Sequence, residues 1–148
     1  MNRSREPEAD ILPTLGALTR KLRALFDDRT QAYGLTEARA RLLLRLSQNG
    51  PMTQSELADA MGVEPPTMVR LIDGMEATGA VRREVVPGDR RQRHVLLTEA
   101  AQAQAESVQA LTDQLRSDVL QGIAPEDVAV TQRVLRQMLE NVAKASQS

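Results

Sequence analysis

The sequence contains no cysteine and only one histidine, His94, and these two absences exclude several kinds of functional site. A chain without cysteine cannot form a disulfide, a thiol redox switch or a cysteine-based metal site. A zinc site built from several histidines is nearly excluded as well, because only one histidine is present. We therefore expect no metal and no cofactor.

Aromatic residues are almost as scarce, since Phe26 and Tyr33 make up 1% of the chain. The core must then be built from leucine, valine, isoleucine, methionine and alanine, which suits packed helices better than a large sheet. No apolar run approaches the roughly 20 residues that span a bilayer, and the polar segment Met1–Asp10 lacks the apolar stretch of a signal peptide. The sequence predicts no membrane partner and a cytoplasmic location.

The sequence gives almost no support to an enzyme. It has no cysteine nucleophile, no histidine paired with a carboxylate beyond the lone His94, and no glycine-rich phosphate-binding loop. We interpret His94 as a strand residue that faces solvent or phosphate, and Glu37, Arg39 and Arg41 as a solvated helix face. We therefore expect no catalytic residues.

Length and periodicity indicate a mainly α-helical protein with a small β-hairpin. At 148 residues the chain is long enough for one domain with a core and too short for two. We expect a disordered arm over residues 1–9 and a single domain over residues 10–148. Apolar spacing and capping residues predict helices over 10–34, 36–49, 53–60, 65–78, 98–120 and from 125 onward, and strands over 81–86 and 93–97 joined by residues 87–92.

Residues 54–71 have the pattern of a helix-turn-helix. That motif needs apolar residues where its two helices touch, a small residue where they cross and a turn that tolerates positive φ. Ala58 is the small residue, Gly62 supplies the turn, and the apolar contacts are expected from Leu57, Met61, Val63, Met68 and Leu71. Two helices that merely pack at an angle remain the alternative for this stretch taken alone.

The second helix of this motif has a short-chained outer face, formed by Pro66, Thr67, Arg70 and Gly74. A helix with such a face fits the major groove of DNA, which is about 12 Å wide. Arg70 could make two bonds to a guanine or grip a phosphate, and Thr67 could contact a base edge or a thymine methyl. A surface arginine without a partner is the alternative reading of Arg70.

The predicted hairpin carries a local positive charge that the overall net charge of -1 hides. Five arginines stand against Glu84 and Asp89 within residues 82–94, a local net charge of +3 (five minus two). These arginines are Arg82, Arg83, Arg90, Arg91 and Arg93. A polyanion relieves their repulsion, and a narrow minor groove attracts an inserted arginine. Asp89 is near enough to hold the Arg91 guanidinium by a charge-assisted bond, whereas the alternative is a solvated basic loop.

Residues 52–101, with the sequence MTQSELADAMGVEPPTMVRLIDGMEATGAVRREVVPGDRRQRHVLLTEAA, resemble the MarR (multiple-antibiotic-resistance regulator) family and in particular its SlyA-like branch. The resemblance rests on the SELA helix, on PPTMVRLIDGME as recognition helix, on GAVRRE leading into the wing and on DRR with LLT closing it. It implies a winged helix-turn-helix DNA-binding region over 36–97 and a helical dimerisation layer formed by 10–34 and 98–145.

The same resemblance implies a homodimer that binds double-stranded DNA at a pseudo-palindromic operator, most simply as a repressor. It places Arg70 and Thr67 in the major groove and Arg91, oriented by Asp89, in the minor groove. The candidate DNA-binding residues are thus Thr53, Gln54, Ser55, Pro66, Thr67, Arg70, Asp89, Arg90, Arg91 and Arg93. Many members release DNA when a small aromatic acid or phenol binds, so an effector of this kind is an open alternative for which no motif identifies a pocket.

A winged-helix adaptor that contacts protein without reading DNA is the alternative function. An adaptor gains little from the clustering of Arg90, Arg91 and Arg93 on one hairpin, so these arginines favour a regulator that binds DNA.

Overall fold

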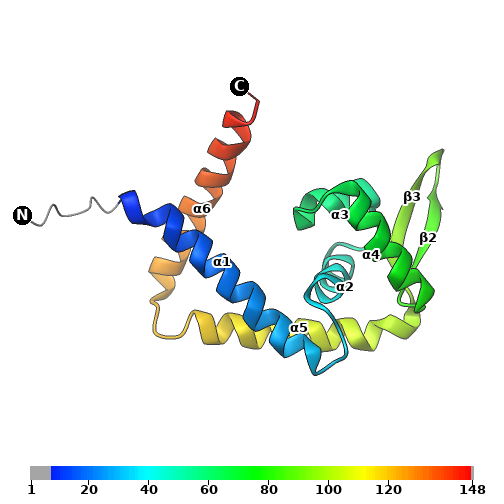
Figure 1. Cartoon of the computed structure of the whole chain (residues 1–148), viewed down its shortest axis with the longest axis horizontal. Helices are drawn as coiled ribbons and strands as arrows, with labels where there is room; N and C mark the ends of the chain where they lie inside the picture. Colours follow the sequence, from blue (N-terminus) through cyan, green and yellow to red (C-terminus); the bar gives the residue numbers. More distant parts are fainter. Residues whose placement is uncertain (1–7, 148) are drawn as a thin grey trace, which may run out of the picture. The chain divides into compact units, whose positions relative to one another are not determined.

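The computed structural model describes residues 8–147, and it describes side chains from residue 10 onward. Most of the predicted arm, residues 1–7, therefore lies outside the described residues, and the first helix begins at Glu8, inside the segment expected to be disordered. The helices and strands are α1 (Glu8–Gln31), α2 (Glu37–Asn49), β1 (Met52–Thr53), α3 (Gln54–Met61), α4 (Pro65–Ala77), β2 (Val81–Val86), β3 (Asp89–Leu97), α5 (Glu99–Val119) and α6 (Pro125–Ala145) (Figure 1).

The chain forms two compact units, the first ending at Thr112 and the second beginning at Asp113. The first contains α1 to α4, the sheet and most of α5, while the second contains the end of α5 and α6. The single domain over residues 10–148 stays a prediction. Among residues 8–147, none of the helices combines the length and the apolar character that a membrane span requires.

The second helix, α2, is fixed at both ends and along one side. The Thr36 hydroxyl oxygen accepts a hydrogen bond from the Arg39 backbone N–H at 3.3 Å, as an N-cap does. The predicted solvated face is wrong for Arg41, which donates to the Met61 carbonyl oxygen at 3.1 Å and lies 3.4 Å from Glu37. Arg39 is likewise half-buried. Arg41 therefore links α2 to the end of α3.

The sheet has three antiparallel strands in the order β1-β3-β2. β2 has the predicted bounds, but β1 was not predicted, because two residues are too few to show a period. β3 begins at Asp89 rather than at Arg93, so the expected connection over residues 87–92 is wrong. Only Pro87 and Gly88 connect β2 to β3, and the φ angle of 85° at Gly88 is one that glycine adopts readily.

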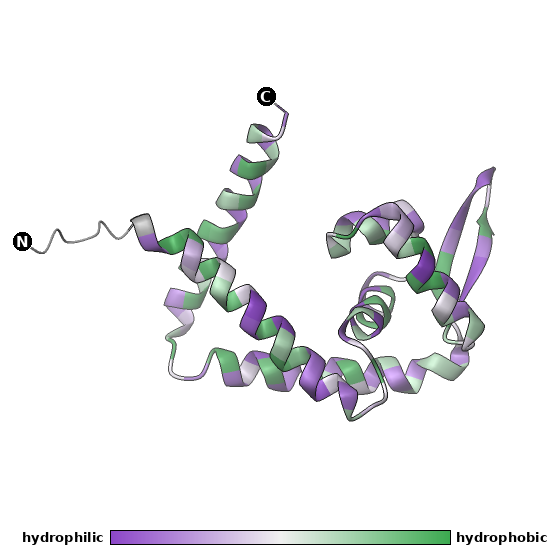
Figure 2. Cartoon of the chain, in the orientation of Figure 1, coloured by the Kyte–Doolittle hydropathy of each residue, from purple (hydrophilic) through white to green (hydrophobic). Residues whose placement is uncertain are grey.

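The core of the first unit is aliphatic, as the lack of aromatics predicted. Its largest fully buried side chains, apart from Thr30, are Leu42, Leu43, Leu57, Met61, Met68, Ile72, Met75, Val81, Val95 and Val108. They come from α2, α3, α4, the sheet and α5, so the helix-turn-helix and the hairpin share one core. Hydrophobic and hydrophilic residues alternate along α1 and α6, whereas the hairpin is mostly hydrophilic toward its tip (Figure 2).

Candidate nucleic-acid interface

The turn between α3 and α4 has the geometry that a helix-turn-helix requires. Gly62 ends α3 in the left-handed conformation (φ 64°, ψ 36°), and the Val63 N–H donates to the Ala58 carbonyl oxygen at 3.1 Å. A residue with a Cβ is disfavoured in this conformation, which explains the glycine. Ala58 is buried at the crossing, as predicted. The helix-turn-helix is therefore confirmed in its turn and its crossing.

Three of the four residues that were predicted to form the outer face of α4 are accessible to solvent. Pro66, Thr67 and Arg70 are exposed, and within residues 10–147 the Arg70 guanidinium makes no hydrogen bond or ion pair. Gly74 is different, because it is half-buried and a Cβ there would lie 3.1 Å from Arg39 Nη2. The helix thus presents a thin surface on which Arg70 is the one charged side chain among the four predicted residues.

Three predicted residues lie at the start of α3 and play unequal parts. The Thr53 hydroxyl oxygen accepts from the Glu56 N–H at 3.2 Å and caps the helix. The Gln54 side-chain oxygen accepts from Arg83 Nε at 3.0 Å. Ser55 is exposed. Only Ser55 has a side chain that is free, within the described part of the chain, to contact a ligand without losing an internal bond.

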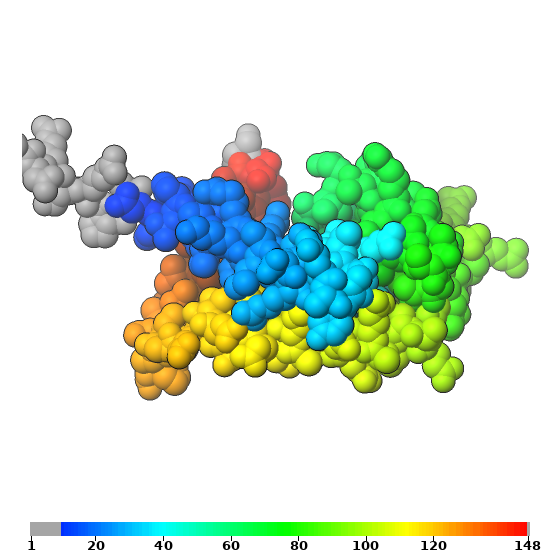
Figure 3. All heavy atoms as spheres, turned by 60° about the horizontal axis from the view of Figure 1, so that its bottom comes forward, coloured from blue at the N-terminus to red at the C-terminus, as the bar shows by residue number. Residues whose placement is uncertain are grey.

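The hairpin tip bulges where the arginines are. Val85 pairs with Arg93 and the next residue, Val86, pairs with Asp89, so residues 90–92 of β3 have no partner in β2. Arg90 and Arg91 thereby leave the ladder and are exposed. The hairpin extends beside α4 and its tip stands out from the neighbouring helices (Figures 1 and 3). A bulge of this kind re-aims side chains at a functional edge.

Asp89 acts on the backbone of the tip rather than on a guanidinium. Its Oδ1 accepts a hydrogen bond from the Arg91 backbone N–H at 3.0 Å. The expected bond to the Arg91 side chain is not found among the described residues, so that part of the prediction is corrected. Asp89 shapes the bulge and leaves the guanidinium of Arg91 available.

Sequence reasoning missed Arg83, which it counted only as wing charge. Arg83 Nη2 lies 2.6 Å from Asp73 Oδ1, its Nη1 lies 2.9 Å from Glu76 Oε1, and its Nε donates to Gln54. The Arg83 side chain is 17% exposed, whereas Arg90, Arg91 and Arg93 are exposed residues. The signal was strand alternation, since Arg83 is two residues from buried Val81 and so shares its inward face.

A groove joins the start of α3 to the hairpin. It has a volume of about 480 Å³ and is lined by Thr53, Gln54, Ser55, Glu56, Arg83, Arg91, Gln92 and Arg93. The structure thus brings two predicted clusters together, the α3 start and the wing arginines. Pro66, Thr67 and Arg70 are not part of this groove and lie on α4. Positive side chains beside a helix N-terminus favour an anion.

Comparison with known proteins agrees with this architecture. A sequence model of the MarR family matches residues 35–93. The solved structure of the transcriptional regulator PA3341 is 40% identical in sequence, with a TM-score of 0.85 over 89% of this chain and 97% of that chain.

Two more distant structures share the fold. The transcriptional regulator SlyA has a TM-score of 0.82 at 21% identity, over 91% of this chain and 95% of its own. A MarR-family transcriptional regulator from Listeria monocytogenes, solved in complex with a 26mer DNA, has a TM-score of 0.84 at 20% identity, over 91% of this chain and 90% of its own. Helices around a small antiparallel wing are common to all three structures and this chain, as a winged helix-turn-helix predicts.

Proposed function

The chain belongs to the MarR family, and from that premise we propose that it is a sequence-specific transcriptional regulator that binds double-stranded DNA as a homodimer. The observation that carries the proposal is the pair of free cationic surfaces in one unit: Arg70 on the outer face of α4 and the arginines of the bulged hairpin tip. Assignment to the SlyA-like branch remains a prediction.

The outer face of α4 suits the major groove. Pro66 and Thr67 are short and exposed, so the helix can approach base edges closely. Arg70 is then the side chain with the reach and the paired donors to bond guanine O6 and N7. Its guanidinium has no competing carboxylate in the described chain, so no internal bond must break on binding.

The hairpin tip suits the adjacent minor groove. Arg90, Arg91 and Arg93 have no ion pair within the described residues, whereas Arg82 is held by Glu84 at 2.7 Å. A narrow minor groove concentrates negative potential and favours an inserted arginine. Exposed apolar Val85 lies beside them in β2, so the tip is not uniformly polar.

The groove between α3 and the hairpin suits a backbone phosphate. Ser55 and the N-terminal turn of α3 offer neutral donors, while Arg91 and Arg93 offer charge from the other wall. Contacts to phosphates set the position of a protein on the duplex without reading its sequence. We assign this groove to positioning, and the α4 face to reading.

We propose that a second copy of the chain packs against the apolar faces of two helices, α1 and α6. Leu12 in α1 is 68% exposed, and α6 has no buried residue while its Leu139 and Val142 are 71% and 64% exposed. Exposed apolar side chains along a helix face mark an interface. Each helix is amphipathic in its own right, and a dimer would place two recognition helices on the two halves of a pseudo-palindromic operator.

Repression is the simplest form of the proposed activity, because occupancy of an operator is enough to produce it. Release by a small aromatic or phenolic effector, which the family resemblance implies, rests on that resemblance. Phe26 is buried and Tyr33 is exposed, so neither stands ready as the wall of an aromatic pocket.

Salt dependence of DNA binding tests the proposal. A duplex is first selected from a random library with the full-length protein, and its association constant K is then measured at several salt concentrations. We expect log K to fall by about 0.9 per phosphate neutralised for each unit of log salt, with several phosphates per subunit. Failure to enrich any duplex, or a flat salt response, would instead support the protein adaptor.

A further inference from the structure

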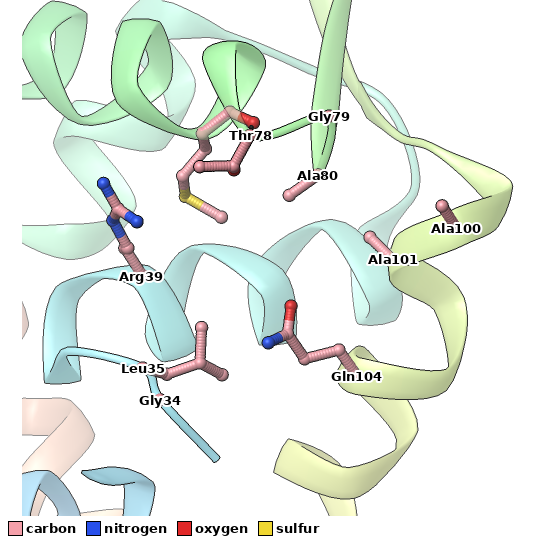
Figure 4. A pocket seen from close by; sticks show the side chains of 10 residues that line it. Gly34, Leu35, Arg39, Thr78, Gly79, Ala80, Ala100, Ala101 and Gln104 are labelled. Carbon is pink, nitrogen blue, oxygen red and sulfur yellow. Dashed lines mark hydrogen bonds between the residues drawn. The ribbon is translucent and has the colours of Figure 1, made fainter.

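A cavity of about 300 Å³ lies within the first unit, at the C-terminal end of the recognition helix and the root of the hairpin. Its walls come from the segment before α2, from α2, from the end of α4 with the turn after it, and from the start of α5 (Figure 4). Leu35, Met75 and Ala101 are buried and form an apolar surface in it. None of the proposed DNA contacts belongs to this cavity.

A cation without a partner faces this cavity. Arg39 is half-buried, and within residues 10–147 its guanidinium makes no hydrogen bond and no ion pair, although its backbone N–H is bonded to Thr36. Its Nη2 is held near α4, 3.1 Å from where a Cβ of Gly74 would be. A partly desolvated charge without a counter-ion is costly, and an anion in the cavity would relieve that cost.

A second polar group points into the same space from the opposite wall. The side chain of Gln104, on α5, extends toward the cavity as Arg39 does from α2 (Figure 4). Gln104 is half-buried, and its amide has no bond among the described side chains and backbone. The Thr78 hydroxyl donates its proton to the Met75 carbonyl oxygen at 3.0 Å and so leaves only its oxygen to the cavity as an acceptor. Donors to an anion are therefore Arg39 and Gln104.

We propose that this cavity binds a small aliphatic monocarboxylate, with its carboxylate on Arg39 and Gln104 and its hydrocarbon part against Leu35, Met75 and Ala101. The guanidinium fork matches two carboxylate oxygens. One cation and no acidic side chain among the lining residues favour a single negative charge on the ligand. The lining has no aromatic side chain for stacking, and its volume is at the lower end for ligand sites.

Titration of the isotope-labelled full-length protein with hexanoate, followed by amide NMR shifts, tests the proposal. We expect saturable shifts at Gly79, Ala80 and Ala101, with a dissociation constant on the order of 1 mM. Hexanamide, which has the same shape without the charge, should bind at least tenfold more weakly. This comparison uses the native protein and so needs no variant that must fold.

Two variants locate the anion contact. Arg39→Gln should weaken hexanoate binding at least tenfold, while Arg23→Gln, which removes an equal charge from an exposed position on α1, should leave it unchanged. The proposed site is contradicted if hexanoate causes no amide shifts, or if hexanamide causes equal shifts. It is also contradicted if the shifts persist in Arg39→Gln. Tighter binding of benzoate than hexanoate at the same amides overturns the aliphatic class. DNA is absent throughout, so the outcome is independent of the proposed function.

Discussion

The guanidinium of Arg83 in β2 lies 2.6 Å from the carboxylate of Asp73 in α4, and this ion pair joins the hairpin to the recognition helix. Glu76, one helical turn further along α4, holds the same guanidinium at 2.9 Å and also accepts the Arg83 backbone N–H at 3.2 Å. Gln54 Oε1 accepts a hydrogen bond from Arg83 Nε, which links the same guanidinium to α3. The Arg83 side chain therefore links the hairpin to both helices of the motif, in addition to the core that they share.

Arg83→Lys is expected to weaken DNA binding although it keeps the charge. A lysine ammonium cannot bond Asp73, Glu76 and Gln54 at the same time as the planar guanidinium does. The hairpin should therefore be held less firmly against α4. Since Asp73 and Glu76 are 59% and 44% exposed, solvent screening limits the loss in the free energy of unfolding to about 1 to 2 kcal/mol. Chemical denaturation and DNA anisotropy measure the two effects.

Arg82→Lys is the matched control, because Arg82 is the neighbouring arginine and its one ion pair within residues 10–147 is with exposed Glu84. Its unfolding free energy should change by less than about 1 kcal/mol. Equal DNA affinity for native protein and Arg83→Lys would show that charge alone matters at this position, and the positioning role would be lost.

The helices and turns of the fold could be predicted from the sequence more completely than the contacts of the charged side chains. Helix starts at Thr36 and Thr53 were predicted from capping chemistry, and the hydroxyl bonds are present. Gly62 was predicted as the turn, and its positive φ is present. Such features are local, since each depends on a residue and on neighbours within about four positions.

The roles of arginines could not be predicted in the same way, because they depend on residues distant in sequence. Arg83 meets a residue 29 positions away, and Arg41 meets a carbonyl 20 positions away. Charge counting treats each arginine as free and so assigned both to solvent or to the wing. The bulge at residues 90–92 was missed for a related reason, since it appears only when the register of two strands is known.

Arg91→Ala should reduce DNA affinity and its dependence on salt without changing the fold. The side chain is exposed and has no internal partner in the described chain, so only contacts to DNA are lost. We expect a loss of about 1 to 3 kcal/mol in binding, with the slope of log K against log salt reduced by about 0.9. Unchanged affinity, with circular dichroism identical to the native protein, would remove the hairpin tip from the interface.

Arg70→Ala should alter sequence preference rather than general affinity. If Arg70 bonds a guanine, the variant loses discrimination at one position in each half-site, worth about 1 to 3 kcal/mol. Selection of duplexes from a random library with both proteins compares the preferences directly. A uniform loss across all duplexes would make Arg70 a phosphate contact instead.

Leu139→Asp should convert the proposed dimer to monomers. Leu139 is 71% exposed in the single chain, so the substitution does not disturb the packing of α6 in its own unit, but a buried carboxylate at an interface is costly. Sedimentation velocity should show a monomer, and DNA affinity should fall because two half-sites are no longer bound together. The control Gln137→Asp places the same charge on a different side of α6 and should remain dimeric. A monomeric native protein would contradict the proposed assembly.

Gly74→Ala is expected to raise the free energy of unfolding by about 0.5 to 1 kcal/mol, because glycine inside a helix is less favourable than alanine. The new Cβ would meet only Arg39 Nη2, at 3.1 Å, and the end of a flexible side chain can move by a few tenths of an ångström. Gly62→Ala should have the opposite sign, since its φ of 64° disfavours alanine although the space around it is empty. Denaturation at one protein concentration compares the two variants. A decrease in the free energy of unfolding for Gly74→Ala as large as that for Gly62→Ala would contradict this prediction. It would mean that the Arg39 guanidinium cannot move away from the new Cβ.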